Sequence, residues 1–474
     1  MVTQTASLAI LKVVETFPGG DYMANKKLPR EKVFRDPVHN YIHVQDSVIL
    51  DLINSPEMQR LRRIHQLGVS SIVFQGAEHT RFTHSLGVYE IAREICDNFA
   101  ANYPSRTPGD GLWDNSERLL TLCAALLHDI GHGAYSHTFE HIFHTNHEDI
   151  TREIITSPDT RVNAILRGVS PEFPDQVASV IDHQYPNPQV VQMISSQIDA
   201  DRMDYLLRDA YNTGTNYGLF DLTRILRVMR PYAGGIAFEP SGMHAVEDYI
   251  VSRFQMYQQV YFHPVSRGME VVLTGVLKRA KELYEAGSVK KEFRPRLLIP
   301  FFGQDFNLDD YLQLDDGVLT TYFHYWQRYP DPILSDLADR FLNRRPLKSL
   351  PFSTGTADLL PAMRQAVADA GFDPAYYTAI NNSFDLPYDQ YDPTSASPKT
   401  QIEIMQLDGS LEELSTLSPL VAAITGKVSG DQRFFFPKVM LTSKDDPDWQ
   451  PAYGEFQQYL AHGQIIDPRI NRLL

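Results

Sequence analysis

Histidines crowd one stretch of this chain, residues 119–147. Six of the sixteen histidines fall within twenty positions there, at 128, 132, 137, 141, 144 and 147. Residues 119–127 are apolar enough to form a buried helix, with Gly131 as the capping residue beyond its end. His128 and Asp129 then lie at the last turn, where an imidazole and a carboxylate provide two ligands for a divalent transition metal. A lone histidine is more often structural, but this pair within the cluster favours a metal site.

The length and charge of the chain limit what it can do. A chain of 474 residues exceeds a typical single domain and favours two lobes. A formal net charge of −16 argues against a broad nucleic-acid-binding surface, because phosphate binding requires clustered lysine and arginine. The only cysteines, Cys96 and Cys123, lie in apolar helical patterns and are expected to be buried thiols of a cytoplasmic protein.

The sequence indicates neither membrane insertion nor secretion. No apolar run approaches the roughly 20 residues of a membrane span. The first residues lack the basic region and the cleavage site of a signal peptide. Residues 1–22 are therefore interpreted as a disordered extension or as a gene start placed too early.

Two further helices are expected to bring ligands to the histidine cluster. Residues 79–99 predict a helix with Thr83 as N-cap and His84 in its first turn. Residues 194–214 predict a second helix, with polar side chains recurring at steps of three and four residues on one face. These side chains are Asp201, Asp204, Tyr205, Arg208 and Asp209. A solvated lattice of ion pairs is the alternative, but the apolar flanks favour burial, and buried carboxylates need partners or metals.

Arginines recur in two other predicted helices. Near residue 55 a helix begins with Asn54 or Ser55 as its cap and Pro56 as its first residue. Its arginines, at 60, 62 and 63, form either a solvated face or an anion site. Residues 244–270 predict a helix that alternates arginine, tyrosine and histidine with apolar residues. Such side chains either stack on a base or sugar and bind phosphates, or pack in the core.

These residues together indicate a metal-dependent phosphohydrolase. Two histidines and two aspartates, namely His84, His128, Asp129 and Asp201, suit Mn, Fe, Mg, Ni or Zn and leave room for water and substrate. The lack of cysteine pairs excludes a cysteine-based structural zinc site. Histidines 132, 137 and 147 supply acid–base groups near neutral pH. Arginines 81, 202, 208 and 253 indicate a polyanionic substrate.

The order His84, His128-Asp129, Asp201 is the signature of the HD-domain phosphohydrolase superfamily, which this chain resembles. Longer blocks are similar to those of the HD-domain deoxynucleoside-triphosphate (dNTP) triphosphohydrolases, which include bacterial enzymes and an animal enzyme that carries a SAM domain. These blocks are QRLRRIHQLG (59–68), HTRFTHSLGV (79–88), LLHDIGHGAYSHTFE (126–140), HEDIT (147–151), IDADRMDYLLRDA (198–210) and QVYFHP (259–264). The resemblance extends from about Val33 to Arg267, and we expect the bacterial type to be closer.

The resemblance implies a mainly α fold, with an HD-domain helical core at residues 31–285. A smaller α+β C-terminal lobe follows at 286–474, with a regulatory or oligomerisation role. Residues 1–30 would be a disordered N-terminal extension. In the C-terminal lobe, residues 402–414 predict a strand followed by an Asp-Gly turn, and residues 433–441 predict a broken strand.

The resemblance also implies the reaction and the residues that perform it. Family members cleave between the α-phosphorus and the 5′ oxygen, releasing a deoxynucleoside and tripolyphosphate. The implied metal ligands are His84, His128, Asp129 and Asp201. The implied acid or base is His147 or His132, with Glu140 orienting a histidine. The implied phosphate contacts are His137, Arg81, Arg202, Tyr205 and Arg253. Gln66 and Leu67 would border the sugar, and Tyr261 and Asp209 would favour deoxyribose over ribose.

An effector site is implied as well. The animal enzyme binds an activating guanine nucleotide between subunits, through residues that match Lys32, Val33, Asn54, Gln59 and Arg62. Asn54 stands where that enzyme has an aspartate that accepts from two donors of the guanine edge, and an amide offers only one acceptor oxygen there, which leaves the base preference open. Glu140 and Arg202 also replace an aspartate and a lysine, which changes side-chain reach. We expect a homotetramer activated by dGTP or GTP.

Two other interpretations remain. The chain could be an HD-domain nucleotidase or phosphodiesterase that acts on another nucleotide, with phosphate, pyrophosphate or a linear nucleotide as product. It could also be a non-enzymatic nucleotide-sensing or single-strand-binding module. Loss of a metal ligand would signal such a module, and all four ligands are present.

Overall fold

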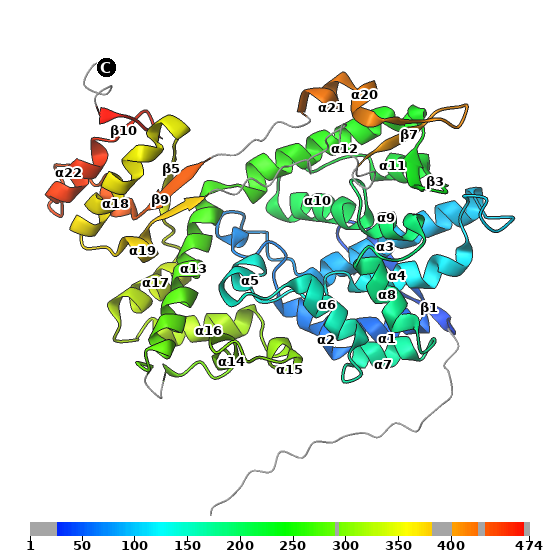
Figure 1. Cartoon of the computed structure of the whole chain (residues 1–474), viewed down its shortest axis with the longest axis horizontal. Coiled ribbons are helices and arrows are strands. Elements are labelled where there is room, and N and C mark those ends of the chain that lie inside the picture. Colours follow the sequence, from blue (N-terminus) through cyan, green and yellow to red (C-terminus); the bar gives the residue numbers. More distant parts are fainter. Residues whose placement is uncertain (1–25, 290–292, 382–400, 425–431, 469–474) are drawn as a thin grey trace, which may run out of the picture.

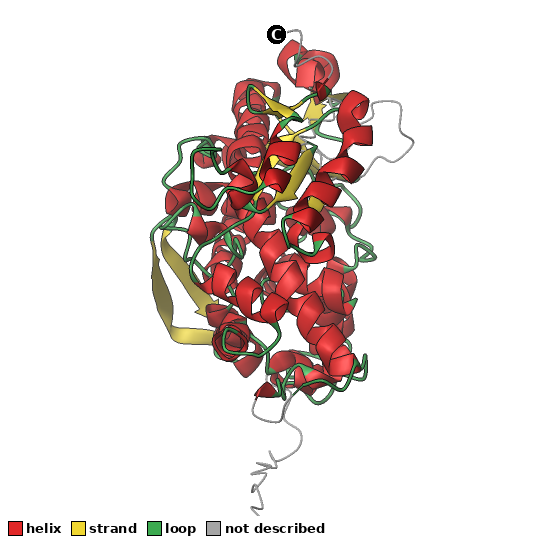
Figure 2. Cartoon of the chain, turned by 90° about the vertical axis from the view of Figure 1, so that its left-hand side faces the viewer, coloured by secondary structure: helices red, strands yellow, loops and turns green. Residues whose placement is uncertain are grey.

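The structure, a computed structural model, describes residues 26–289, 293–381, 401–424 and 432–468 (Figure 1). Helices make up most of the molecule and the strands form small sheets, so the predicted mainly α fold is confirmed (Figure 2). A disordered extension was predicted at residues 1–30. Residues 1–25 of it lie outside the described residues, and residues 27–30 form the start of β1. Among the described residues, no helix has both the length and the apolar character needed to cross a lipid bilayer.

The first part of the chain contains β1–β4 and α1–α13. Their bounds are β1 (Lys27–Asp36), β2 (Asn40–Asp46), α1 (Ser47–Ile53), α2 (Pro56–Arg60), α3 (Arg81–Asn102), α4 (Arg118–Leu127), α5 (His137–Phe143), α6 (His147–Thr156), α7 (Arg161–Arg167), α8 (Phe173–Ile181), α9 (Pro188–Ile194), α10 (Ala200–Thr213), α11 (Leu222–Val228), β3 (Met229–Tyr232), β4 (Gly235–Phe238), α12 (Met243–Met256) and α13 (Pro264–Glu285).

The second part contains the remaining elements. Their bounds are α14 (Ile299–Phe302), α15 (Leu308–Leu312), α16 (Asp316–Trp326), α17 (Pro332–Leu342), β5 (Lys348–Pro351), α18 (Leu360–Asp369), α19 (Pro374–Tyr377), β6 (Ala379–Asn381), β7 (Glu403–Met405), β8 (Leu411–Glu413), α20 (Leu414–Leu417), α21 (Pro419–Ile424), β9 (Arg433–Phe436), α22 (Pro451–Gln457), β10 (Leu460–Ala461) and β11 (Gln464–Ile465).

Within the described ranges the strands form four small sheets. β1 and β2 pair antiparallel and form a hairpin. The strand and Asp-Gly turn predicted at 402–414 form the hairpin β7–β8. This hairpin extends the sheet of β3 and β4, with Phe238 beside Ile404. A segment far along the sequence therefore packs on the first part of the chain. The third sheet has the order β5-β9-β6, and β10 pairs with β11.

One large hydrophobic cluster extends through most of the chain, from Ile42 to Phe435. A second, smaller cluster fills the space among α18, α22 and β9 (Figure 1). Cys96 and Cys123 are buried free thiols, as predicted. The long α13 packs against α17, α19 and β5, so it joins the two parts of the molecule.

The prediction of a single helix at residues 244–270 is wrong, because two helices with a turn between them cover this segment. α12 ends at Met256, a π-helical turn covers Tyr257–Tyr261, and α13 begins at Pro264. Proline at the first helical position starts a helix, because its missing N–H has no intrahelical partner there in any case. The side chain of His263 caps the new helix by accepting from the backbone N–H of Val265.

Candidate active site

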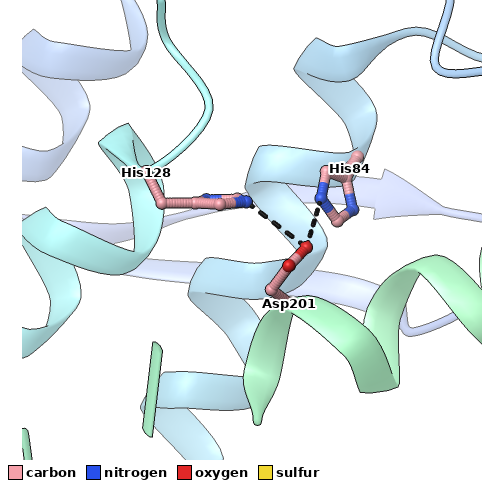
Figure 3. Close-up of side chains that lie close together, drawn as sticks. All are labelled: His84, His128 and Asp201. Atoms are coloured by element: carbon pink, nitrogen blue, oxygen red, sulfur yellow. Dashed lines mark ion pairs between the residues drawn. The ribbon is translucent and has the colours of Figure 1, made fainter. Parts of the chain in front are cut away.

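Three helices bring His84, His128 and Asp201 together (Figure 3). His84 lies in the first turn of α3, His128 caps the C-terminus of α4, and Asp201 lies in the first turn of α10. The Oδ1 atom of Asp201 lies 3.0 Å from Nε2 of His84 and 3.4 Å from Nε2 of His128. Helix ends thus direct all three side chains to one point.

The caps of two of these helices differ from the prediction. Thr80, not Thr83, is the N-cap of α3, and Thr83 instead donates to the carbonyl of Thr80 within the first turn. α10 begins at Ala200 rather than near residue 194, because Asp199 caps it by accepting from the backbone N–H of Arg202. Both shifts leave His84 and Asp201 in first turns.

The fourth predicted ligand, Asp129, lies beside this group. Its Oδ1 atom is 3.4 Å from Nε2 of His128, and its Oδ2 atom is 3.7 Å from Nε2 of His84. Arg81 donates to Oδ2 of Asp129 at 2.5 Å and to the hydroxyl of Ser136 at 3.1 Å. Asp129 is therefore shared between the candidate metal site and Arg81.

The hydrogen bonds of the two histidines show that a cation fits between them and Asp201. Nδ1 of His128 donates to the carbonyl of Ala125 at 2.9 Å, and Nδ1 of His84 lies 2.8 Å from Oδ2 of Asp204. Both Nε2 atoms are buried, and neither makes a hydrogen bond within the part of the chain that the structure describes. In neutral imidazoles they would direct lone pairs at a carboxylate, which is unfavourable unless a proton or a metal ion lies between.

The distances in the group also suit a metal ion. An ion with bonds of about 2.1 Å holds neighbouring ligand atoms roughly 3.0–3.4 Å apart. The separations from Asp201 to His84 and to His128 are 3.0 and 3.4 Å. Imidazole nitrogens with carboxylate oxygens suit Zn, Fe, Mn, Ni or Mg, so the donor set fits the predicted divalent cofactor without fixing its identity.

Charges in this group oppose the effect of burial. Burial alone lowers the pKa of His84, but the carboxylates of Asp201 and Asp204 outweigh it and raise the pKa to about 10. Burial raises the pKa of Asp201, but His128 and His84 outweigh that effect and hold the pKa below its usual range. Positive charge at this point, from a proton or a metal, therefore stabilises the arrangement.

A second group lies next to the first and contains His132, His147 and Glu140. The two imidazole rings stack, with centroids 3.9 Å apart, and Oε1 of Glu140 lies 2.9 Å from Nδ1 of His147. Burial lowers the pKa of His147, but Glu140 outweighs it and raises the pKa. Burial and Arg81 hold the pKa of His132 well below its usual range. Neighbouring titratable groups with oppositely shifted pKa values are typical of acid–base pairs.

The loop after α4 packs closely against α6, and this contact brings the rings of His132 and His147 together. Gly131 was expected to cap α4 with a left-handed backbone, but its φ is not positive. A Cβ at Gly131 would lie 2.2 Å from the carbonyl oxygen of His147, so glycine allows the loop to touch α6. Tyr135 and Ser136 have φ of 50° and 44°, a strained conformation of the kind found near functional sites. His137 begins α5, and its side chain lies outside the described part of the chain.

A cavity of about 710 Å³ opens beside the two groups. Six residues predicted to bind substrate line it: Gln66, Leu67, Arg81, Tyr205, Asp209 and Tyr261. The hydroxyl of Tyr261 donates to Oδ2 of Asp209 at 2.8 Å, and His79 lies 2.7 Å from Oδ1 of the same carboxylate. The tyrosine and the aspartate that were predicted to select the sugar therefore form one polar wall.

Arg202 and Arg253, also predicted to contact phosphates, do not line this cavity. Arg202 donates to Asp199 at 2.6 Å and to the carbonyl of Ser196. Arg253 donates to Oε1 of Gln197 at 2.9 Å. Both arginines are turned toward the start of α10.

Several residues of the cavity escaped the sequence analysis. Arg267 and Glu270, an ion pair 2.9 Å long on α13, line one side. Ile380 of β6 and Phe435 of β9 line another. Arg267 lies in the segment 244–270, whose arginines were noted in the sequence. No signal identified the two apolar strand residues, which are more than a hundred positions from the nearest predicted site residue, Tyr261.

The residues implied for an effector lie on β1 and around α2. Lys32, Val33 and Asn54 are exposed. Gln59 donates to the carbonyl of Ile53, and its Oε1 atom accepts from Nε of Arg62 at 2.8 Å. An effector site at these residues stays a prediction.

The interpretation of the arginines beside α2 changes at one position. Arg60 belongs neither to a solvated face nor to an anion site, because it is buried, lies over the ring of Tyr311 and donates to the carbonyl of Leu314. Arg63 forms an ion pair with Asp315 at 2.5 Å. The apolar pattern did not reveal the burial of Arg60, because its cover comes from residues some 250 positions away.

Comparisons with known proteins agree with this site. Residues 81–209 match the HD domain, and residues 220–294 match the HD associated region. The uncharacterized protein YwfO of Bacillus subtilis is 50% identical over 418 residues, which cover 88% of this chain and 94% of YwfO. The deoxynucleoside triphosphate triphosphohydrolase SAMHD1 of Gallus gallus is 28% identical over 290 residues, which cover 52% of this chain and 45% of that protein.

A solved structure is similar over most of the molecule. A phosphohydrolase from Bacteroides thetaiotaomicron aligns with a TM-score of 0.73 at 28% identity and covers 86% of this chain and 99% of its own. HD domains are metal-dependent, which agrees with the group formed by His84, His128 and Asp201. The chain therefore belongs to the HD-domain phosphohydrolase superfamily.

Proposed function

We propose that this protein hydrolyses dNTPs to a deoxynucleoside and tripolyphosphate. The observation that carries the proposal is the cavity beside the histidine–aspartate centre, with Arg81 at one end and the Tyr261–Asp209 pair in its wall. Its volume of about 710 Å³ lies within the roughly 300–1,000 Å³ of small-molecule sites. The similarity to the triphosphohydrolase SAMHD1 supports the same reaction.

The metal centre would be held by His84, His128, Asp129 and Asp201. A divalent ion bound there polarises a phosphoryl oxygen and lowers the pKa of water. Arg81 lines the cavity next to this centre and donates to Asp129, and both observations support a role for its guanidinium group in binding the phosphates.

The reaction requires two proton transfers. Water forms a bond to the α-phosphorus and loses a proton, while the bond from that phosphorus to the 5′ oxygen breaks and this oxygen gains a proton. We assign the acid to His147, because Glu140 favours its charged form. His132 is the base, because burial and Arg81 keep it neutral.

The polar wall would select the sugar. Tyr261 and Asp209 hold one another, so their positions in the cavity are fixed. Asp209 would accept a hydrogen bond from the 3′ hydroxyl of deoxyribose, and the ring of Tyr261 would lie where a 2′ hydroxyl would need space. Gln66 and Leu67 would border the same sugar.

We also propose a nucleotide activator and a homotetramer in the cytoplasm. The exposed Lys32, Val33 and Asn54 and the joined pair of Gln59 and Arg62 are available for dGTP or GTP between subunits. The two free thiols suit a reducing compartment.

Product analysis tests the reaction. The purified protein is incubated with Mn²⁺ and each dNTP, and the products are separated by anion chromatography. We expect tripolyphosphate and free deoxynucleoside, both absent with His128→Ala. The control His144→Asn changes an exposed histidine of the same stretch and should keep full activity. Pyrophosphate, phosphate or a linear nucleotide would indicate the alternative nucleotidase or phosphodiesterase instead.

A separate experiment tests the effector. Turnover of dATP is measured with and without GTP or dGTP, and the assembly is followed by analytical ultracentrifugation. We expect the added nucleotide to raise both the rate and the mass, and Lys32→Ala to weaken both responses while leaving the reaction products unchanged. A rate and a mass independent of GTP and dGTP would remove the effector site from the proposal.

A further inference from the structure

A ring of buried charges joins the tip of the β1–β2 hairpin to the candidate metal centre. Arg208 donates to Asp36 at 2.9 Å and to Asp204 at 2.8 Å. Nε2 of His39, in the hairpin turn, lies 2.6 Å from Oδ1 of Asp204. The other oxygen of Asp204 lies 2.8 Å from Nδ1 of His84. One carboxylate therefore links the hairpin, α10 and a predicted metal ligand.

The ring is closed off from solvent. The side chains of Asp204, Arg208 and Asp36 are 0, 1 and 5% exposed, so their charges need one another. Gly87 lies one turn after His84 on α3, and a Cβ there would lie 1.8 Å from Asp204. The glycine thus leaves the space in which the carboxylate sits beside the metal ligand.

The hairpin turn is built to aim His39. Oδ1 of Asp36 accepts from the backbone N–H groups of Val38 and His39, each at 2.9 Å, while Oδ2 accepts from Arg208. Asn40 follows with a φ of 64°, which asparagine tolerates better than most residues. The same aspartate that shapes the turn therefore docks it on α10.

We propose that His39 is a positioning residue of the metal centre. With Arg208 it holds Asp204 in the orientation that accepts the Nδ1 proton of His84, and this leaves Nε2 of His84 to bind the metal ion. Mutation of a carboxylate that fixes the tautomer of a metal-binding histidine typically costs 10–100-fold in metal affinity. The inference rests on the metal centre proposed above.

The arrangement has a second consequence. Because one ring serves both the hairpin and the metal ligand, docking of the hairpin and binding of the metal are linked. Linkage is reciprocal, so bound metal stabilises the docked hairpin by the factor with which docking raises metal affinity. β1 of this hairpin also carries Lys32 and Val33, the residues implied for the effector. Events on the hairpin surface can thereby reach the catalytic centre.

Mn²⁺ titration of the full-length, metal-stripped protein by calorimetry tests the inference. We expect His39→Ala, which removes one of the two groups that hold Asp204, to weaken Mn²⁺ binding about tenfold, the lower end of that range. His39→Gln, whose amide places a donor near the original Nε2, should restore most of the affinity. The control His43→Ala removes a half-exposed histidine of the same hairpin, which pairs with Glu31, and should leave the affinity unchanged.

Hydrogen exchange of the wild type provides a readout that needs no variant. We expect Mn²⁺ to slow exchange of the amides of Val38 and His39. Equal Mn²⁺ affinity of His39→Ala and wild type, or exchange at these amides that Mn²⁺ does not change, would overturn the inference while leaving the metal centre in place. A wild type that binds no Mn²⁺ would instead overturn the metal centre itself.

Discussion

At the scale of single residues, stacking keeps two histidines close while their surroundings separate their chemistry. The ring centroids of His132 and His147 lie 3.9 Å apart. Each ring has a different charged neighbour, and these neighbours shift the two pKa values in opposite directions. Arg81 acts on His132 together with burial, and Glu140 acts on His147 against burial. A buried cation therefore favours a neutral ring in one position, and a carboxylate favours a charged ring in the other.

Removing the carboxylate should change the pH profile of the reaction. The raised pKa of His147 keeps the acid protonated to higher pH, so kcat/KM should fall on the alkaline side as pH rises through that pKa. Glu140→Gln removes the charge, and the alkaline limb should move to lower pH, with kcat/KM at pH 8 reduced about tenfold or more. Steady-state rates from pH 5.5 to 9 measure this.

The acidic limb and a nearby variant serve as controls for that profile. Glu148→Gln changes the exposed acid next to His147 in the sequence and should leave both limbs in place. An alkaline limb that does not move in Glu140→Gln would show that His147 is not the acid.

At the scale of elements, the site depends on how closely the loop after α4 approaches α6. Gly131 donates to the hydroxyl of Thr151 at 2.9 Å, and its missing Cβ leaves room for the backbone of His147. This contact holds α6 in the position that stacks His147 on His132. The stack is therefore a property of the packing between two elements.

Gly131→Ala should separate these elements. The added methyl would overlap a backbone oxygen that cannot rotate away, so we expect a loss of about 1–3 kcal/mol in the free energy of unfolding. The rate should fall by more than the loss of folded protein explains, because the two rings move apart. Urea unfolding and rates under folded conditions measure both. Gly303→Ala, where a Cβ meets only ordinary contacts at 3.8 Å, should change stability by less than about 0.5 kcal/mol.

Elements with a local cause could be predicted from the sequence. Ser55 and Pro56 begin α2 as expected, and the apolar run before His128 forms α4. His84 and His128 were predicted because each lies near the end of an expected helix, and Asp201 because polar residues recur on one face of its helix and because the order of these residues resembles the superfamily signature. Contacts between segments far apart in the chain were not predicted.

The features that were missed depend on tertiary contacts. Arg60 was expected on a solvated face or in an anion site because nothing near it in the sequence could cover it, whereas Tyr311 and Leu314 do so in the structure. The contribution of Ile380 and Phe435 to the cavity follows from the way the sheet with the order β5-β9-β6 packs on α13. Such contacts leave no periodic signal in a sequence.

In the molecule as a whole, the second part of the chain anchors the loop that contains Tyr135 and Ser136. Asp316, the first residue of α16, accepts from the backbone N–H of Tyr135 at 2.8 Å. Its other oxygen lies 2.6 Å from Nδ1 of His65, whose Nε2 is 2.9 Å from Glu78. A residue almost two hundred positions away thus anchors the strained loop of Tyr135 and Ser136 and the segment that leads to Gln66.

The hydrogen bond between His65 and Asp316 should make the free energy of unfolding depend on pH. The hydrogen bond to Asp316 raises the pKa of His65, so the folded protein binds this proton more tightly than the unfolded chain does. The resulting stabilisation is complete below the unfolded pKa of about 6.5 and is lost as pH rises through the folded pKa. Asp316→Asn should therefore destabilise the protein more at pH 6 than at pH 8.

The size of that effect can be measured by urea unfolding at both pH values. We expect Asp316→Asn to cost about 1–3 kcal/mol at pH 6, as for a hydrogen bond to a charged group, and less at pH 8. Asp309→Asn, at an exposed position of α15, should show no such difference. An equal cost of Asp316→Asn at pH 6 and pH 8 would show that the contact does not depend on the charge of His65.

The sheet with the order β5-β9-β6, which we call the C-terminal sheet, also contributes to the cavity in which we expect the substrate to bind. Ile380 and Phe435 line the cavity from β6 and β9, whereas Arg81 lines it beside the metal centre. If the phosphates bind at Arg81 and the sugar at Tyr261 and Asp209, the apolar sheet residues are left for the base. Ile380→Trp would fill part of this space and should raise KM for every dNTP about tenfold, with little change in kcat, because the reacting atoms are untouched.

A matched variant separates this effect from general damage to the lobe. Val439→Trp adds the same side chain at a partly exposed position outside the cavity and should leave KM unchanged. Because tripolyphosphate lacks a base, its inhibition constant should be the same in Ile380→Trp and wild type. A parallel loss of tripolyphosphate binding would mean that the sheet supports the phosphate end and that the base lies elsewhere. Selective loss of dNTP binding would make the C-terminal sheet part of the active site, since the cavity is complete only when both parts of the chain enclose it.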